Sequence, residues 1–289
     1  MRARLLGSAL AVVVSFAIAW LLLVLVVRPS NERDWERDQE RLATAELDGD
    51  RVTIRNIRNF TYRSTTDYDP AWYDRTFDLG SLDRAWFVVE PFGSFEGAAH
   101  TFVTFGFSDR DFLAISIEIR KEKGEQFSAL AGLFRQYEIM YVIGDERDLI
   151  GLRTNHRRDE VFLYPVRATT EQIQAMFIGM LKRANELAGT PEFYNTLVNT
   201  CTTNLVRHVN DITPGRIPPS PAILFPGYSD RLAFDLGLID TDLPFEQLRE
   251  RYRINDLAIE HADAPDFSHR IRGVEGHGQM SSRGFDSRM

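Results

Sequence analysis

Residues 99–120 decide the fold and read AHTFVTFGFSDRDFLAISIEIR. Residues 101–105 are rich in β-branched and aromatic side chains. Residues 112–120 are apolar up to Ile115, and from there apolar and polar side chains alternate to Arg120. Between them, residues 108–111 are of the types that favour a turn. The stretch therefore predicts an antiparallel β-hairpin.

Other β-branched and aromatic runs extend this pattern. They predict further strands at residues 85–89, 137–143 and 161–166. The helical signals come later in the chain than these runs. Strands followed by helices predict an α+β fold built on an antiparallel sheet.

Two helices are predicted after the strands. Thr169 and Gln172 form a capping-box signature before apolar residues at helical spacing, and this run ends at Gly189. The apolar stripe is explained by core packing. A second helix is expected to start near Cys201 and to stop before Pro214.

The N-terminal segment at residues 5–27 carries no charged side chain, and a helix of this length spans the roughly 30 Å of a bilayer core. Arg2 and Arg4 precede it, which by the positive-inside rule leaves residues 1–4 as a cytoplasmic stub. No small-x-small cleavage site follows before Arg28, so we expect an uncleaved transmembrane anchor. A cleaved signal peptide is the alternative. In both cases the rest of the chain is extracytoplasmic.

The rest of the chain is predicted to form three regions. Residues 28–59 are expected to be a charged stalk, because residues 31–47 interleave arginine with acidic residues and suit a solvated helix. Residues 60–272 are expected to form one extracytoplasmic domain. Residues 273–289 are rich in glycine, serine and arginine and are expected to be a disordered tail.

The composition argues against several classes of function. Setting aside Arg2, Arg4 and Arg28 leaves 31 of the 34 basic side chains against 42 acidic ones, a net charge of −11. Nucleic acid is therefore not expected as a partner, because phosphate binding needs a basic surface. The sequence also contains no phosphate loop, dinucleotide fingerprint or cluster with metal-ligand spacing, so no cofactor and no metal are expected.

Cys201 is the only cysteine among the 289 residues. Outside the cytoplasm a lone thiol cannot be half of an intramolecular disulfide, so it is a buried small hydrophobe, half of an intermolecular bridge or a nucleophile. In the first turn of a helix it faces the positive end of the macrodipole, which favours the thiolate. Thr202 adds a polar donor nearby. This setting makes Cys201 a candidate nucleophile.

A thiol nucleophile needs a base, and the strongest candidate is His100 at the start of the hairpin. If the turn holds an odd number of residues, His100 lies opposite Glu118 or Arg120, on the face that also carries Ser116. An even number turns it toward the isoleucines between them. The sequence leaves this register open, and a solvated strand face or a cross-strand ion pair is the alternative role for Glu118 and Arg120.

Two other histidines compete with His100 for the role of base. His156 lies in the charged run at residues 153–158, which is predicted to be a surface turn. His208 follows Cys201 by about two helical turns, and a separation of about 10 Å is too long for proton transfer within one helix. His100 therefore remains the predicted base.

Five motifs, which include the residues discussed above, together resemble those of a known family. They are Ala99-His100-Thr101-Phe102, Ser116-Ile117-Glu118-Ile119-Arg120, Gly132-Leu133-Phe134-Arg135-Gln136-Tyr137-Glu138, Phe193-Tyr194-Asn195 and Asn199-Thr200-Cys201-Thr202-Thr203. Through them residues 68–272 resemble the bacterial family that shares the Lnb N-terminal periplasmic domain. The resemblance implies a circularly permuted papain-like thiol fold, akin to lecithin:retinol acyltransferase-like proteins, in which the histidine strand precedes the cysteine helix.

The resemblance also implies roles for individual residues. Cys201 becomes the nucleophile and His100 the base. Independently of the resemblance, the odd register would make Glu118 the third catalytic residue. The family's cysteine usually follows an asparagine directly, whereas here Thr200 stands in that place. The expected oxyanion or supporting residues are Asn199, Thr202, Ser116 and Arg120, together with the backbone N–H of Cys201.

The sequence and the resemblance together predict a single-pass protein of the bacterial inner membrane with most of its chain in the periplasm. The namesake of the family transfers an acyl chain to bacterial lipoproteins. We therefore expect an acyltransferase or acyl hydrolase that works through a thioester on Cys201, with a membrane phospholipid as acyl donor and a lipoprotein, another amine or water as acceptor. A papain-like cell-wall amidase or peptidase and a non-catalytic envelope binding or assembly protein are the alternatives.

Overall fold

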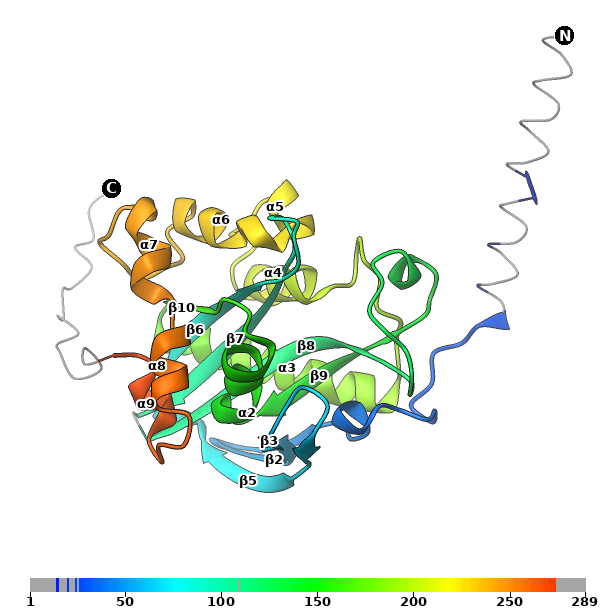
Figure 1. The fold of residues 1–289 in the computed structure, drawn as a ribbon, viewed down its shortest axis with the longest axis horizontal. Helices are drawn as coiled ribbons and strands as arrows, with labels where there is room; N and C mark the ends of the chain where they lie inside the picture. Colours follow the sequence, from blue (N-terminus) through cyan, green and yellow to red (C-terminus); the bar gives the residue numbers. More distant parts are fainter. Residues whose placement is uncertain (1–13, 16–19, 21–23, 25, 109, 274–289) are drawn as a thin grey trace, which may run out of the picture.

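The computed structural model describes residues 14, 15, 20, 24, 26–108 and 110–273 (Figure 1). Among these residues, no helix has both the length and the apolar character needed to cross a bilayer. Most of the predicted anchor at residues 5–27, the stub at residues 1–4 and the tail beyond Gly273 lie outside the described residues.

The described residues form a mixed α+β fold on an eight-stranded sheet in the order β1-β2-β9-β8-β7-β6-β10, with β5 paired to β2 (Figure 1). Its strands are β1 (Thr44–Asp48), β2 (Arg51–Arg58), β5 (Trp72–Asp78), β6 (Leu82–Pro91), β7 (Ala99–Phe107), β8 (Asp111–Arg120), β9 (Glu138–Gly144) and β10 (Phe162–Pro165). Neighbouring strands are antiparallel except β2 and β9. A separate small pair is formed by β3 (Thr61–Tyr62) and β4 (Tyr68–Asp69).

Helices cover both faces of the sheet. On one face lie α3 (Thr170–Gly189) and α4 (Cys201–Ile212), whose apolar side chains pack with Val103 and Phe105 of β7. On the other face, where Phe102 points, lie α2 (Glu146–Gly151), α8 (Asn255–Glu260) and α9 (Phe267–Arg270). The remaining helices are α5 (Pro221–Leu224), α6 (Ser229–Asp235) and α7 (Phe245–Tyr252). Short 3-10 turns are η1 (Arg37–Gln39), η2 (Leu79–Ser81), η3 (Ala131–Leu133) and η5 (Pro226–Tyr228), and η4 (Leu152–Arg157) continues α2 as a π-helix.

The predicted hairpin is confirmed as β7 and β8. Its last pair, Phe107 with Asp111, leaves a turn of three residues, 108–110, which is an odd number. The other predicted strands correspond to β6, β9 and β10, and the two predicted helices correspond to α3 and α4. The capping box of Thr169 and Gln172 is present at the start of α3.

The predicted helical stalk at residues 28–59 is wrong. Residues 44–58 instead form β1 and β2, and β2 pairs with β1, β5 and β9 inside the sheet. The physical reason is that Val52, Ile54 and Ile57 are fully buried in the core, whereas the charged Arg51 and Arg55 stay exposed. The domain therefore begins before residue 60.

Candidate active site

The helix α4 begins at Cys201 and places its thiol at the N-terminus of the helix. Thr200 is the N-cap, and its hydroxyl accepts from the backbone N–H of Thr203, whose own hydroxyl accepts from the N–H of Thr200. This reciprocal capping box fixes where the helix starts. The residue Cys201 is 8% exposed, and its Sγ lies 3.7 Å from the hydroxyl of Thr202. The thiol therefore faces the positive end of the helix dipole in a largely buried place.

Asn199 supports the loop before the helix. Its Nδ2 donates to the carbonyl of Phe193 at 2.9 Å, and its Oδ1 accepts from Nδ2 of Asn204 at 2.9 Å. The side-chain amide of Asn199 is thus engaged within the loop. Of the two roles predicted for this residue, the geometry favours the supporting one over oxyanion binding.

The strands β7 and β8 separate where the site lies. Their ladder reaches only as far as Phe102 and Ser116, while β7 continues along β6 to Ala99 and β8 continues along β9 to Arg120. The start of α4 approaches β7 at this point, since the hydroxyls of Thr101 and Thr202 lie 3.0 Å apart. The divergence of two strands therefore opens the position that Cys201 occupies beside His100.

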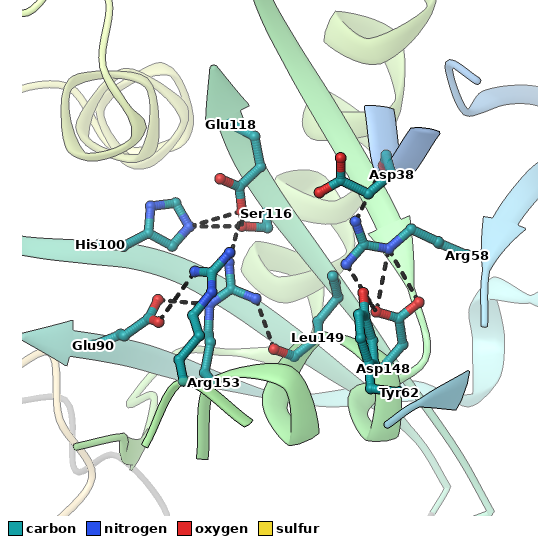
Figure 2. Close-up of polar contacts among 11 residues, drawn as sticks. Asp38, Arg58, Tyr62, Glu90, His100, Ser116, Glu118, Asp148, Leu149 and Arg153 are labelled. Atoms are coloured by element: carbon teal, nitrogen blue, oxygen red, sulfur yellow. Dashed lines mark hydrogen bonds and ion pairs between the residues drawn. The ribbon is translucent and has the colours of Figure 1, made fainter. Parts of the chain in front are cut away.

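His100 lies on the polar face of the hairpin, as an odd turn requires. Its Nε2 is 2.7 Å from the hydroxyl of Ser116 and 3.2 Å from Oε1 of Glu118 (Figure 2). Ser116 also donates to Oε1 of Glu118 at 2.6 Å. Because Nε2 is occupied by these two partners, Nδ1 is the ring nitrogen left for the thiol of Cys201, which lies close enough to His100 for each group to shift the pKa of the other.

Behind Glu118 lies a buried ion-pair network that sequence reasoning missed. Arg153 donates through Nη2 to Oε1 of Glu118 at 2.7 Å, through Nε to Oε2 of Glu90 at 2.6 Å and through Nη1 to the carbonyl of Leu149 at 2.6 Å (Figure 2). The side chains of Arg153 and Glu90 are only 2% and 1% exposed. Arg153 therefore holds the carboxylate that faces His100.

The prediction that residues 153–158 form a surface turn is wrong for Arg153. The helix α2 continues directly into η4, and Leu149, Ile150 and Leu152 are buried along it. Arg153 follows Leu149 and Ile150 at helical spacing and so shares their buried face. This spacing is the sequence signal that would have found it.

Electrostatic contacts shift the pKa values of the pair in opposite directions. Burial alone would lower the pKa of His100, but Glu118 and Cys201 raise it to about 10. Burial alone would raise the pKa of Cys201, but His100, the backbone N–H of Thr101 and the hydroxyl of Thr202 lower it to about 7. At neutral pH about half of the thiol is therefore ionised, beside an imidazolium.

Glu118 remains ionised in this arrangement. Burial would raise the pKa of its carboxyl group, but contacts with His100, Arg153 and Ser116 hold that pKa well below its usual value. Negative and positive charges thus alternate along the chain of contacts that runs from Glu90 through Arg153, Glu118 and His100 to Cys201. Each buried charge has an opposite charge beside it, as burial requires.

Arg120 lies outside the site, in contrast to its predicted supporting role. Its guanidinium group donates to the carbonyls of Gln39 and Glu40, each at 2.9 Å, and to Oδ1 of Asn31 at 3.0 Å. It also stacks 4.2 Å from the ring centroid of Trp35. The side chain of Arg120 therefore anchors the segment before β1, which the sequence had suggested was a separate stalk.

The competing histidines have other partners. His208 is buried on α4 with its Nε2 2.9 Å from the hydroxyl of Tyr141, and burial lowers its pKa to about 4. The ring of His156 packs against Tyr62, with the centroids 5.6 Å apart. Within the described residues, no group of three or more His, Cys, Asp or Glu side chains is arranged to hold a metal ion.

An apolar cavity of about 100 Å³ lies along α4 and is lined from Thr202 onward. One wall is the face of α4 formed by Thr202, Leu205, Val206 and Val209. The opposite walls come from β6, β7, α3 and α6, and include Phe87, Val103, Met176, Leu232 and Ala233. Thr202 belongs both to this lining and to the surroundings of Sγ, whereas Cys201 and His100 are not among the lining residues.

The comparisons with known proteins point to one family. The model of the Lnb N-terminal periplasmic domain matches residues 68–222, which is more than half of the chain. The matched residues include both His100 and Cys201. No curated protein and no solved structure matches the chain.

Proposed function

Because the chain belongs to the family of the Lnb N-terminal periplasmic domain, we propose that it acts in the bacterial periplasm as a cysteine acyltransferase or acyl hydrolase through a thioester on Cys201. The observation that carries the proposal is the contact between Cys201 and His100, which lowers the pKa of the thiol to about 7. A thiolate at the start of a helix, beside a base that a carboxylate orients, is the arrangement that nucleophilic catalysis requires. The order of histidine strand and cysteine helix also supports a permuted papain-like fold.

The acylation step follows from the pair. The thiolate of Cys201 attacks the carbonyl carbon of an ester, a C–S bond forms, and the carbonyl oxygen takes the negative charge. N–H groups in the first turn of α4, including that of Cys201, have no carbonyl partner within the helix and suit this oxyanion. The C–O bond to the leaving alcohol then breaks, and the imidazolium of His100 gives its proton to the alcohol oxygen.

The deacylation step reverses these roles. The amine nitrogen or the water oxygen of the acceptor attacks the thioester carbon, and the neutral imidazole of His100 takes a proton from that acceptor. A C–N or C–O bond forms, the C–S bond breaks, and the thiolate of Cys201 leaves beside the restored imidazolium. Glu118 stabilises the imidazolium form at both stages, because its Oε1 lies 3.2 Å from Nε2.

The apolar cavity favours an acyl chain over a polar peptide as the group that Cys201 receives. Its lining residues are nearly all apolar, and the hydroxyl of one of them, Thr202, lies 3.7 Å from Sγ. By comparison, an apolar cavity of about 150 Å³ takes up benzene. A cavity of about 100 Å³ therefore suits the carbons nearest the thioester. We propose a membrane phospholipid as the donor and a lipoprotein or another amine as the acceptor, with residues 5–27 as an anchor in the inner membrane.

The test is intact mass spectrometry of the full chain after incubation with phospholipid vesicles. The proposal predicts a fatty-acyl mass increase that hydroxylamine removes and that Cys201→Ala and His100→Ala both lack. The matched control is His208→Gln, a second buried histidine outside the site, which is expected to keep the adduct. No adduct on a Cys201 that alkylates rapidly would reject acyl transfer from phospholipid, and no adduct on an inert Cys201 would reject the thiol enzyme altogether.

A further inference from the structure

Exposed apolar side chains gather on four segments around the candidate active site. They lie on the β6–β7 turn at residues 92–98, the loop at residues 125–136, the loop at residues 195–199 before α4, and residues 221–228 in α5 and η5. Their most exposed side chains reach 43–66% exposure and include Phe95, Phe127, Leu130, Leu197, Val198 and Phe225. We call this surface the apolar rim. Soluble proteins seldom expose so many large apolar side chains together.

The four segments form one continuous surface. The rings of Phe95 and Phe225 lie 5.8 Å apart, and Figure 1 shows the β6–β7 turn beside α5 at the upper edge of the molecule. The rings of Phe92 and Phe127 lie 6.4 Å apart. The hydroxyl of Thr196 donates to the carbonyl of Ala129 at 2.6 Å and so joins the third segment to the second.

Two segments of the apolar rim lead directly into the reactive pair. The β6–β7 turn leads directly into Ala99 and His100, and the loop with Leu197 and Val198 leads directly into Cys201. A substrate that reaches the thiol from outside therefore passes this surface. The loop at residues 195–199 and the stretch at residues 221–228 contain no charged residue, so nothing in them opposes entry into an apolar phase.

The apolar rim also contacts the uncharged N-terminal segment. The ring of Trp20 packs edge-on against Phe134 at 5.8 Å, and Nη1 of Arg135 donates to the carbonyls of Val24 and Val27, each at 3.3 Å. Residues 5–27 have the length and composition of a membrane-spanning helix. With residues 5–27 as the proposed anchor, the bilayer lies on the side of the molecule that carries the apolar rim.

We propose that the apolar rim docks into the lipid bilayer and opens the active site directly to membrane lipid. This inference deepens the proposed function and rests on it for the identity of the substrate. The large negative net charge of the chain gives no attraction to anionic headgroups, so the docking is apolar. It is expected on neutral and anionic bilayers alike and to change little with salt.

Spin labels on the full chain test the docking itself. Because Cys201 is the only cysteine, Cys201→Ser provides a background for Val198→Cys, Leu130→Cys and the control Ile259→Cys on α8, where Ile259 is 57% exposed. Each labelled protein is reconstituted in phosphatidylcholine vesicles with and without phosphatidylglycerol. Power saturation then compares access to oxygen, which dissolves in lipid, with access to a water-soluble nickel chelate.

The expected result is that the labels at residues 198 and 130 are accessible to oxygen and shielded from nickel in both bilayers, while the label at residue 259 is accessible to nickel. Labels at residues 198 and 130 that nickel reaches would place the apolar rim in water and overturn the proposal. Labels shielded from both reagents would mean that a second protein surface covers the apolar rim, which also overturns it.

A functional measurement separates this inference from the proposed function. The variant Leu130→Asn/Val198→Asn is expected to form the acyl adduct from vesicles at least tenfold more slowly, with iodoacetamide alkylation of Cys201 unchanged. Equal adduct formation would contradict bilayer docking and leave the proposed chemistry intact. If the unmodified chain forms no adduct, the proposed chemistry fails while the spin labels still decide the docking.

Discussion

Arg153 donates through Nη2 to Oε1 of Glu118 at 2.7 Å, and this is the same carboxylate oxygen that lies 3.2 Å from Nε2 of His100. Oε1 of Glu118 therefore accepts a hydrogen bond from Arg153 and also faces the candidate base, His100. Since Glu90 holds the other side of the guanidinium group, the position of Glu118 is fixed from behind. We therefore expect the reactivity of Cys201 to depend on Arg153 through Glu118 and His100.

Arg153→Met is expected to lower stability and to slow alkylation of Cys201. It leaves Glu90 buried without this partner, and removal of one member of a buried ion pair destabilises a protein by roughly 3–5 kcal/mol. Arg120→Met is the matched control, because that arginine is equally buried but contacts the segment before β1. The free energy of unfolding measured in urea should fall in both variants, whereas the alkylation rate should fall only in Arg153→Met. An unchanged rate in Arg153→Met would show that the network does not reach the thiol.

Ser116→Ala and Glu118→Gln are expected to differ in size of effect. Ser116→Ala removes one hydrogen bond to His100, worth about 1 kcal/mol, and should slow acyl-adduct formation about fivefold. Glu118→Gln removes the negative charge that raises the pKa of His100, so the imidazolium form weakens and the pH midpoint for alkylation of Cys201 should move upward. Rates of adduct formation and alkylation between pH 5 and 10 measure both effects. A larger loss in Ser116→Ala than in Glu118→Gln would reverse the assigned roles.

Stability should fall in mild acid because of His208. Burial lowers the pKa of this imidazole to about 4, with Asp211 opposing the shift, so the folded state holds it neutral while the unfolded state binds a proton below pH 6.5. Above pH 6.5 His208 does not reduce the free energy of unfolding. As the pH falls from 6.5 to 4, the free energy of unfolding decreases by up to roughly 3 kcal/mol because of this residue. Urea unfolding of His208→Gln should show a smaller loss over this range. An identical pH slope in both proteins would contradict the assignment.

The sequence predicted the hairpin well, because the alternation in residues 115–120 and a polar turn are local signals. It also placed the start of α4 near Cys201, where the structure shows a capping box between Thr200 and Thr203. The register of His100 against Glu118 needed the length of the turn, which composition does not give. The structure supplies it through the pair of Phe107 with Asp111.

The remaining differences come from contacts between residues far apart in the chain. Arg120 shares a strand with Glu118, but its partners Gln39 and Glu40 lie about 80 residues earlier. Residues 44–48 form an edge strand with exposed charges, so their pattern differs little from that of a solvated helix. Arg153 stands in a run of charged residues and was therefore predicted to be exposed. The structure shows it on the buried face of α2 and η4.

The most direct test of the central claim is the rate of iodoacetamide alkylation of Cys201 in the folded protein between pH 5 and pH 10, beside His100→Gln. Since Cys201 is the only cysteine, the measured rate reports this thiol alone. A thiolate held by His100 predicts a midpoint at about pH 7 that moves to pH 9 or above in His100→Gln. A midpoint near 9 in both proteins, or no reaction in the folded state, would show that Cys201 is not an activated nucleophile.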